Sequence, residues 1–192
     1  MKRPQAPGIS RPMPLPPLES FGPRLMICGT SNTGKSTLAA AISARHGMPV
    51  VHLDQLRFLP NTDWVERPDD AFRALHDAAI EGASWVMEGN YSKLMPQRIA
   101  RATGILLLSD SRAANFVRYL RRTLFQPERV GALEGNRDSL KWGMVHWVLV
   151  QAPRNAHRMR ETLPAAGLPF HELGSIREVR EAYRAWGLER GR

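Results

Sequence analysis

One stretch of eight residues constrains this chain more than any other feature of its sequence. Residues 29–36 read Gly-Thr-Ser-Asn-Thr-Gly-Lys-Ser and match the pattern G-x-x-x-x-G-K-[ST] at every position. The short apolar run 25–28 precedes the pattern, and the amphipathic stretch 35–46 follows it. The sequence therefore predicts a strand, a glycine-bounded turn and a helix in succession, which is the context that this pattern requires.

The residue types in this turn suit the binding of phosphate groups. Its glycines let the backbone curl so that consecutive N–H groups point inward and form a nest for anionic oxygens. The first turn of the following helix adds N–H groups that have no helical partner, together with the positive end of the helix dipole. The residues expected to hold the phosphates are Gly29, Thr30, Ser31, Asn32, Thr33, Gly34, Lys35, Ser36 and Thr37.

Two side chains at the end of the turn indicate a nucleoside triphosphate with magnesium as the ligand. The Lys35 ammonium group is placed to bridge the β- and γ-phosphates, and the Ser36 hydroxyl is placed to ligate Mg²⁺. We therefore predict ATP and Mg²⁺ as cofactors, with Lys35 as a catalytic residue and Ser36 as a metal ligand. The alternative is a glycine-containing turn that merely joins a strand to a helix.

Short apolar runs alternate with amphipathic stretches along the rest of the chain. This alternation favours an α/β fold with a parallel sheet that is covered on both faces. The predicted strands are 25–28, 49–53, 85–87, 104–108 and 169–173, and the predicted helices are 35–46, 68–82, 93–101, 112–125, 137–151 and 175–186. Pro153 is expected to end or kink the helix before it.

The N-terminal residues differ from the rest of the chain in composition. Residues 1–23 contain seven of the 15 prolines without hydrophobic periodicity, so we expect a flexible tail there and one domain over 24–192. The single cysteine, Cys28, excludes an intramolecular disulfide framework. No run of about 18 apolar residues and no signal-peptide pattern is present, so we expect a cytoplasmic protein that does not span a membrane.

The net charge of +9 is concentrated in one third of the chain. Residues 98–160 contain 12 basic and 4 acidic residues, which gives this segment a net charge of +8. Such a segment suits polyanions, which include nucleotide phosphates and a nucleic-acid backbone. A solvated basic surface is the alternative interpretation.

Two carboxylates follow predicted strands. Asp54 comes directly after the strand 49–53, and Glu88 comes directly after the strand 85–87. Ligands of open parallel sheets lie beyond the carboxyl ends of the strands, so both side chains are expected near the phosphate loop. We expect Glu88 to act on the metal side through a water of Mg²⁺, and Asp54 to act as a general base toward an acceptor hydroxyl. Each is otherwise an ordinary polar residue that caps a strand or a helix.

Three segments together resemble a known group of proteins. The phosphate loop, His52-Leu53-Asp54 and Glu88-Gly89-Asn90-Tyr91-Ser92 are similar to segments of the small P-loop kinases of the adenylate and shikimate kinase type. The closest resemblance is to the bacterial DNA topology modulation proteins, or FlaR-like proteins, and it covers residues 24–186. In that family the third strand typically ends in Asp-Gly-Asn-Tyr-Ser, whereas this chain has the longer Glu88 at the first of these positions.

The resemblance implies features that the residue pattern alone does not give. It implies the three-layer α/β/α fold of P-loop NTPases, in which five parallel strands have the order 2-3-1-4-5. It also implies an acceptor-binding segment within 54–84 and a helical lid within 118–140. Phosphate-binding arginines and backbone contacts to the base carry over to Arg118, Arg122, Gly174 and Ser175.

Further arginines of the basic segment are candidates for catalysis. Arg122 and Arg137 are expected to stabilise the charge of the transferred phosphoryl group, and Arg154 and Arg158 are placed further along the same segment. Surface solubility or a structural salt bridge is the alternative for each of them.

The acceptor side has four other candidates. The Trp64 ring is expected to stack on a base or sugar, and Arg67 is expected to bind an anionic acceptor. Tyr91 is expected to shape the acceptor site, and Arg98 is expected to contact the acceptor. Local packing is the alternative for Trp64, and a salt bridge is the alternative for the arginines.

These features favour an ATP-dependent phosphotransferase. It would move the γ-phosphoryl group of Mg-ATP to a small hydroxyl or phosphate acceptor, such as a nucleoside or nucleotide. The alternative is a nucleotide-dependent regulatory protein associated with DNA, which the basic segment and the label of the resembling family favour. Nucleic acid is the less favoured partner, because no helix-turn-helix, zinc finger or aromatic RNA-binding platform is evident. The identity of the acceptor and the oligomeric state are not predicted.

Overall fold

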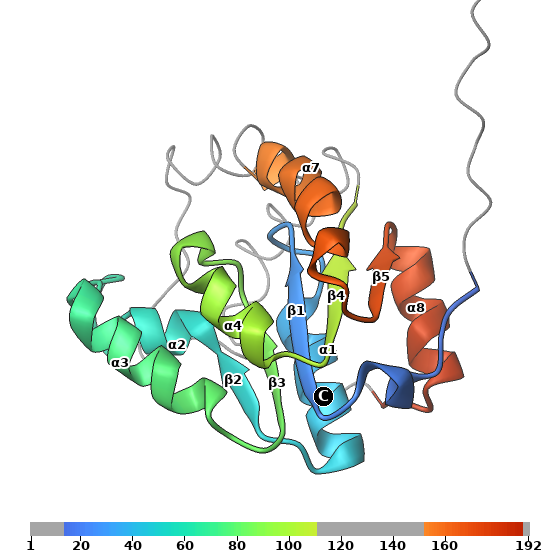
Figure 1. Cartoon of the computed structure of the whole chain (residues 1–192), viewed down its shortest axis with the longest axis horizontal. Coiled ribbons are helices and arrows are strands. Elements are labelled where there is room, and N and C mark those ends of the chain that lie inside the picture. Colours follow the sequence, from blue (N-terminus) through green and yellow to red (C-terminus); the bar gives the residue numbers. More distant parts are fainter. Residues whose placement is uncertain (1–13, 111–151, 190–192) are drawn as a thin grey trace, which may run out of the picture.

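The computed structural model describes residues 14–110 and 152–189, and its centre is a five-stranded sheet (Figure 1). Neighbouring strands are parallel, and their order is β2-β3-β1-β4-β5. This order, with helices on both faces, confirms the expected three-layer α/β/α fold with five parallel strands in the order 2-3-1-4-5. The strands are β1 (Arg24–Gly29), β2 (Val50–His52), β3 (Trp85–Glu88), β4 (Gly104–Leu108) and β5 (Phe170–Leu173).

The central strands are buried on both of their faces. Every residue of β3 and β4 is buried, as is every residue of β1 after Arg24. Side chains of β1 alternate between two cores, so that Leu25 and Ile27 enter one core while Met26 and Cys28 enter the other. Such strands are stable only when helices cover both faces of the sheet.

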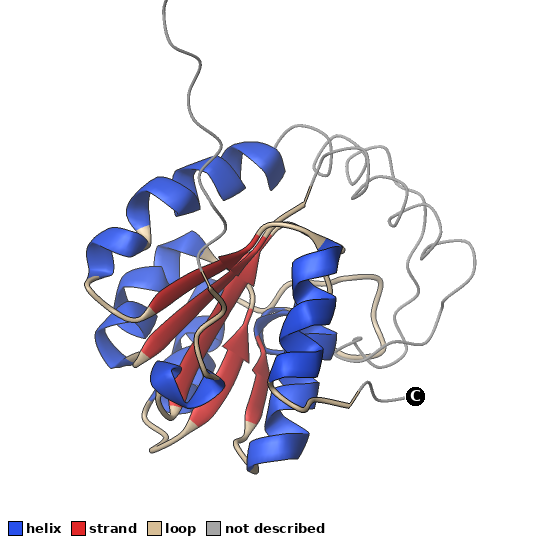
Figure 2. Cartoon of the chain, turned by 90° about the vertical axis from the view of Figure 1, so that its right-hand side faces the viewer, coloured by secondary structure: helices blue, strands red, loops and turns tan. Residues whose placement is uncertain are grey.

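Different helices cover the two cores (Figure 2). The first core is covered by α1 (Lys35–His46) and α8 (Ile176–Ala185), which contribute Leu38 and Val179 among others. The second core is covered by α3 (Asp69–Ile80), α4 (Met95–Arg101) and α7 (Ala152–Thr162). The remaining helical elements are α2 (Leu53–Arg57) and the 3-10 turns η1 (Leu18–Phe21), η2 (Ser92–Leu94) and η4 (Pro164–Ala166).

Two helices of the structure are not predicted by the hydrophobic periodicity. α2 begins at Leu53, which the sequence pattern places in a strand, because a buried leucine suits either element. α7 buries only Ala156 and Met159 among its described side chains, so its apolar stripe is too narrow to indicate a helix. Pro153 lies near the start of the described part of α7, and the predicted helix that it is expected to end or kink lies before it, outside the described residues. The predicted helices 112–125 and 137–151 and the predicted lid 118–140 lie outside the described residues.

The N-terminal segment differs from the expected flexible tail over residues 14–23. Leu18 and Phe21 of η1 are buried in the first core, and the Trp186 indole N–H donates to the Pro16 carbonyl at 3.0 Å. The high proline content of this segment predicts that it is unpacked, and two isolated apolar residues form no periodic pattern that would indicate otherwise. Residues 1–13 lie outside the described part of the chain.

The carboxyl ends of the parallel strands meet at one edge of the sheet, at the top of Figure 1. The turn after β1, the start of α2 and the turn after β3 are linked to one another there by hydrogen bonds. This edge therefore brings the predicted phosphate loop, Asp54 and Glu88 into one region. None of the described helices combines the length and the apolar character needed to cross a bilayer.

Candidate functional site

The turn between β1 and α1 has a backbone that its glycines make possible. Gly29 has a φ of 134°, and a Cβ at this position would lie 1.8 Å from the Leu108 carbonyl oxygen, so no other residue fits. Asn32 and Gly34 also have positive φ values, 64° and 87°. The Thr30 amide donates to the Leu108 carbonyl at 3.0 Å, which fixes the start of the turn against β4.

The end of this turn leaves the start of α1 open to an anion. The N-cap of α1 is Gly34, which has no side chain to accept from the N–H groups of the first helical turn. These N–H groups and the helix dipole favour a negatively charged ligand at this point. Lys35 lies beside them, and its ammonium group donates to the Thr30 carbonyl at 2.9 Å across the turn.

Ser36 and Glu88 lie together at the carboxyl end of β3. The Ser36 hydroxyl donates to Glu88 Oε1 at 2.9 Å, and His52 Nδ1 of the neighbouring strand is 2.9 Å from the same oxygen. Burial tends to raise the pKa of Glu88, but the hydrogen bonds from His52 and Ser36 and the charge of Lys35 hold it below its usual range. A hydroxyl and an ionised carboxylate are hard oxygen donors, so this pair fits Mg²⁺, which binds few protein ligands and keeps several waters.

Asn90 fastens the turn after β3 to the phosphate loop, a role that the motif analysis does not assign. Its side-chain amide N–H donates to the Gly29 carbonyl at 2.9 Å, and its Oδ1 accepts from the Gly29 amide at 3.0 Å. The position of Asn90 within the segment 88–92, just beyond a strand end, is the signal that marks it. His52 is likewise absent from the predicted site, because a single histidine in a strand carries no recognisable pattern.

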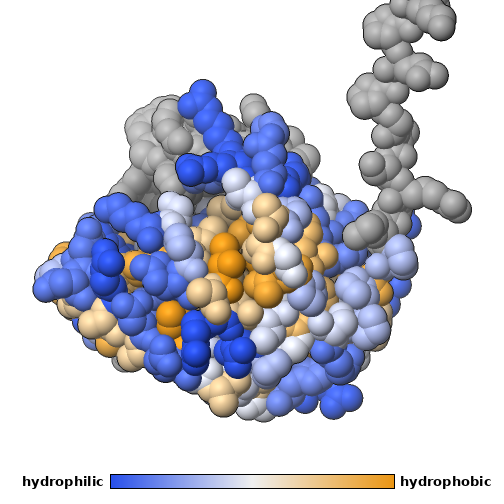
Figure 3. Space-filling view, in the orientation of Figure 1, coloured by the Kyte–Doolittle hydropathy of each residue, from blue (hydrophilic) through white to orange (hydrophobic). Residues whose placement is uncertain are grey.

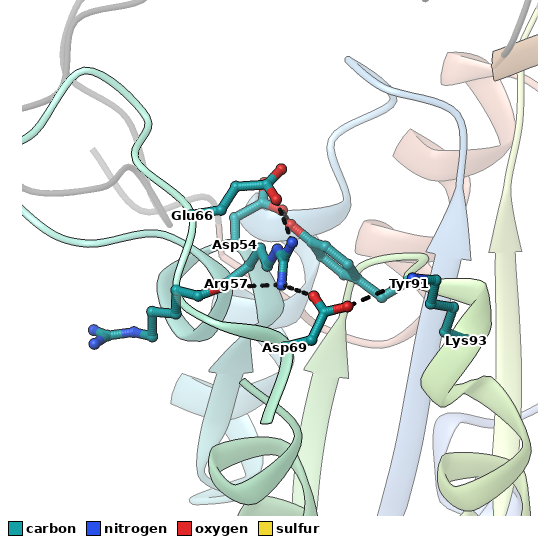
Figure 4. A network of polar contacts seen from close by, with 7 residues as sticks. Asp54, Arg57, Glu66, Asp69, Tyr91 and Lys93 are labelled. Atoms are coloured by element: carbon teal, nitrogen blue, oxygen red, sulfur yellow. Dashed lines mark hydrogen bonds and ion pairs between the residues drawn. The ribbon is translucent and has the colours of Figure 1, made fainter. Parts of the chain in front are cut away.

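Asp54 lies exposed in the first turn of α2 and contacts Tyr91. The Tyr91 hydroxyl donates to Asp54 Oδ1 at 2.7 Å, and the Tyr91 ring packs edge-to-face on Phe72 of α3 at 5.0 Å between centroids. Burial raises the pKa of Tyr91 far above its usual value, and the Asp54 charge raises it further, so the phenol stays protonated as a donor. Figure 4 shows this pair beside the ion pairs of the acceptor side.

Arg57 organises the predicted acceptor segment 54–84, although the sequence analysis does not single it out. Its guanidinium group forms ion pairs with Glu66 and Asp69, the latter at 2.6 Å, and lies 5.4 Å from the centre of the Phe72 ring (Figure 4). The Arg57 carbonyl also accepts from the Arg67 amide at 2.7 Å. These contacts join α2, the loop that follows it and the start of α3 into one unit.

Trp64 and Arg67 lie in this loop. The Trp64 ring packs edge-to-face on Phe58 at 5.3 Å, which is the local packing that the alternative interpretation describes. Arg67 Nε is buried and has no hydrogen-bond partner among the described residues. Figure 3 shows both hydrophilic and hydrophobic side chains on the surface over α3, whose exposed residues include Asp70 and Arg73 as well as Leu75.

Arg98 does not lie where the sequence analysis expects it. The residue has no exposed surface, and its guanidinium group donates to the carbonyls of Gly89, Asn90 and Tyr91. A side chain that is fully buried in this way does not reach an acceptor, so the predicted contact is wrong for this structure. The reason is that Arg98 lies on the inner face of α4, whereas arginines are mostly exposed and the sequence gives no sign of burial.

The end of β5 provides capping contacts. Ser175 Oγ accepts from the Glu178 amide at 3.2 Å, and the Gly174 amide donates to Glu178 Oε2 at 2.7 Å, so both predicted base contacts take part in the N-terminal cap of α8. Nearby, Arg160 of α7 donates to Glu172 at 2.6 Å, a contact that the sequence does not predict. Arg154 and Arg158 are exposed on α7, whereas Arg118, Arg122 and Arg137 lie outside the described residues.

Comparisons with known proteins add solved structures of related shape. No family model matches the chain, and no curated protein matches it. A shikimate kinase from Acinetobacter baumannii in complex with shikimate has a TM-score of 0.48 at 12% identity, over 88% of this chain and 96% of its own. A gluconokinase from Sinorhizobium meliloti 1021 has a TM-score of 0.41 at 15% identity, over 73% and 97%. A sugar kinase from a Janibacter species has a TM-score of 0.48 at 11% identity, over 84% and 92%. The fold assignment rests on the strand order and the loop geometry of this chain itself.

Proposed function

We propose that this protein is an ATP-dependent small-molecule kinase, which moves the γ-phosphoryl group of Mg-ATP to a small hydroxyl or phosphate acceptor. One observation carries the proposal: the phosphate loop, the Ser36–Glu88 pair and Asp54 converge on one edge of the sheet. A protein that only binds nucleotide needs the first two of these features. The general base across from them is what a phosphoryl transfer adds.

The nucleotide side would work through charge and position. Residues 29–37 would hold the phosphates, and Lys35 would exchange its contact with the Thr30 carbonyl for one with the β- and γ-phosphates. Ser36 would ligate Mg²⁺ and Glu88 would hold one of its waters, and the bound metal would supply positive charge against the phosphates. Arg118, Arg122 and Arg137 would stabilise the charge of the moving phosphoryl group, and Gly174 and Ser175 would border the base.

The acceptor side would supply the base and the orientation of the acceptor. Asp54 would take the proton of the acceptor hydroxyl as the new O–P bond forms and the bond to the ADP oxygen breaks. Tyr91 would hold one oxygen of this carboxylate in place, and Trp64 and Arg67 would border the acceptor within 54–84. We assign the lid to 118–140.

The charge of the acceptor segment disfavours the alternative of a DNA-associated protein of the topology modulation type. Residues 54–84 contain seven acidic and three basic residues, a net charge of −4, although the whole chain carries +9. Such a surface repels a polyanion from this side of the site. A small acceptor with few negative charges is compatible with it.

A transfer assay tests the proposal. The protein is incubated with γ-labelled Mg-ATP and a panel of nucleosides, nucleotides, sugars and small alcohols, and the label is followed to the acceptor. We expect transfer to at least one acceptor and its loss in Lys35→Ala. Absence of transfer, together with salt-sensitive DNA binding that ATP alters, would support the regulatory alternative instead.

A further inference from the structure

Arg98 is a buried cation whose hydrogen bonds to the described residues all go to backbone carbonyls. Its NH1 group donates to Gly89 O at 2.9 Å, and its NH2 group donates to Asn90 O and, at 3.1 Å, to Tyr91 O. Among the described residues it has no carboxylate partner, and burial lowers its pKa. Burying a charge costs free energy, which its hydrogen bonds or a charged partner must offset. Here the three carbonyls belong to consecutive residues at the end of β3.

Asn90, the middle one of these three residues, contacts the nucleotide side. Asn90 forms two hydrogen bonds with Gly29, the first residue of the phosphate loop. Gly29 also lies against β4, because a Cβ at this position would be 1.8 Å from the Leu108 carbonyl oxygen, and the Thr30 amide donates to that same oxygen at 3.0 Å. The backbone that Arg98 fixes therefore also fixes the start of the phosphate loop.

Tyr91, the last of the three residues, contacts the acceptor side. Tyr91 has a φ of 32°, a left-handed conformation that a tyrosine rarely adopts. In this conformation its hydroxyl reaches Asp54 and its ring packs on Phe72. Arg98 contributes to this conformation directly, because its NH2 group donates to the Tyr91 carbonyl.

We propose that Arg98 is a positioning residue that couples the two sides of the site, by holding residues 89–91 so that Asn90 meets Gly29 and Tyr91 meets Asp54. The assignment of one side to the nucleotide and the other to the acceptor rests on the proposed function. Arg98 touches neither substrate, and it acts through the backbone that it binds. Its loss should therefore disturb both sides at once, whereas a change in either neighbour should disturb one.

Arg101 provides a matched control on the same helix. Its guanidinium group also donates to two backbone carbonyls, those of Ile80 and Glu81, at 3.4 and 3.3 Å. Those carbonyls lie at the end of α3, away from the phosphate loop and from Asp54. Arg101→Lys therefore tests the general cost of replacing an arginine of α4 that binds carbonyls.

Two measurements report on the two sides without requiring an acceptor. Calorimetry gives the affinity for a non-hydrolysable ATP analogue with Mg²⁺. NMR of protein labelled at tyrosine ¹³Cζ follows the ionisation of the phenols, and Tyr91→Phe assigns the signal of Tyr91. In the wild type this phenol faces Asp54, with Arg57 and Glu66 close by, and it should resist ionisation at high pH.

The variants Arg98→Lys and Arg98→Gln should change both readouts. We expect the analogue to bind at least about fivefold more weakly and the Tyr91 phenol to ionise at lower pH, because neither side chain reproduces the donor fork of arginine. Asn90→Ala should weaken nucleotide binding and leave the Tyr91 signal unchanged. Tyr91→Phe should leave nucleotide binding unchanged and slow transfer to the acceptor. Arg101→Lys should match the wild type in both readouts.

Three results would overturn the coupling. The first is that folded Arg98→Lys and Arg98→Gln retain the wild-type value in both readouts, and the second is that they change only one readout. Alternatively, neither variant folds, in which case Arg98 serves the stability of the domain as a whole. If both readouts change as expected but no acceptor is ever phosphorylated, the kinase proposal fails while the coupling stands.

Discussion

The side of this site proposed to bind the nucleotide and the side proposed to bind the acceptor differ in what they are made of. The nucleotide side is mainly backbone: a turn that only glycine permits at Gly29, and helical N–H groups without a side-chain cap at Gly34. The acceptor side consists of side chains from three separate elements, with Asp54 on α2, Asp69 on α3 and Tyr91 after β3. A site made of backbone can be predicted from a short stretch of sequence, whereas a site made of side chains depends on how elements distant in the sequence pack together.

The largest expected effect lies on the nucleotide side. In Gly29→Ala the new Cβ would overlap the Leu108 carbonyl oxygen at a φ of 134°, so we expect loss of ATP binding and a free energy of unfolding lower by about 3 kcal/mol or more. Gly47→Ala is the control, because Gly47 also has a positive φ, 66°, but nothing lies within 4 Å of the added Cβ. Calorimetry and chemical denaturation measure both quantities. Normal ATP binding by Gly29→Ala would show that the loop geometry described here is not the one that binds phosphate.

The next effect isolates the acceptor side. In Asp54→Asn the general base is removed, so kcat for transfer should fall by about 10²–10⁴-fold while the affinity for Mg-ATP stays at the wild-type value. Asp70→Asn is the matched control, since Asp70 lies exposed on α3 and, within residues 14–110 and 152–189, its side chain accepts only from the adjacent Ala71 amide. Steady-state kinetics and calorimetry separate the two quantities. Transfer at the wild-type rate would remove Asp54 from the mechanism.

A third effect concerns the link between metal and loop. Glu88→Gln keeps a hydrogen-bonding group beside Ser36 and His52 but loses the negative charge, so half-maximal transfer should need about 10- to 100-fold more Mg²⁺. Glu88→Asp retains the charge with a shorter reach, and its requirement should lie between those of the wild type and Glu88→Gln. An unchanged Mg²⁺ requirement in Glu88→Gln would place the metal elsewhere.

The smallest effect is a pH dependence on α3, which borders the acceptor side. Burial lowers the pKa of His76, and its contact with Asp77 only partly opposes this shift. The folded protein thus disfavours the charged imidazole. The contribution of neutral His76 to the free energy of unfolding is therefore fully present above about pH 6.5 and is lost as the pH falls below this value. In His76→Asn the free energy of unfolding, measured by urea denaturation between about pH 7.5 and 5, should fall less steeply with pH. An equal slope in both proteins would contradict this assignment.

The sequence predicts the parts of the molecule in which local pattern determines structure. Helix α1 has the predicted bounds, 35–46, because the glycine-bounded motif marks its start and Gly47 marks its end. The proximity of Glu88 to Ser36 also follows from sequence, since parallel strands end at a common edge. The strand order comes from the family resemblance and is confirmed by the sheet.

The parts that the sequence does not predict are those that depend on tertiary packing. The burial of Arg98 cannot be predicted from its neighbours along the chain, because a helix of only seven residues is too short for its pattern to show which face is inside. Arg57 gains its role only when the following loop folds back and brings Glu66 to it. His52 likewise becomes a partner of Glu88 only through the register of β2 against β3.

Calorimetry of ATP binding in the presence of Mg²⁺ tests the central claim most directly. If the turn after β1 holds the phosphates of the nucleotide, the wild-type protein should bind Mg-ATP at a single site, Lys35→Ala should bind it far more weakly, and Asp54→Asn should bind it as the wild type does. No heat of binding in the wild type, or equal affinity in Lys35→Ala, would contradict the assignment of this turn and the kinase function that depends on it.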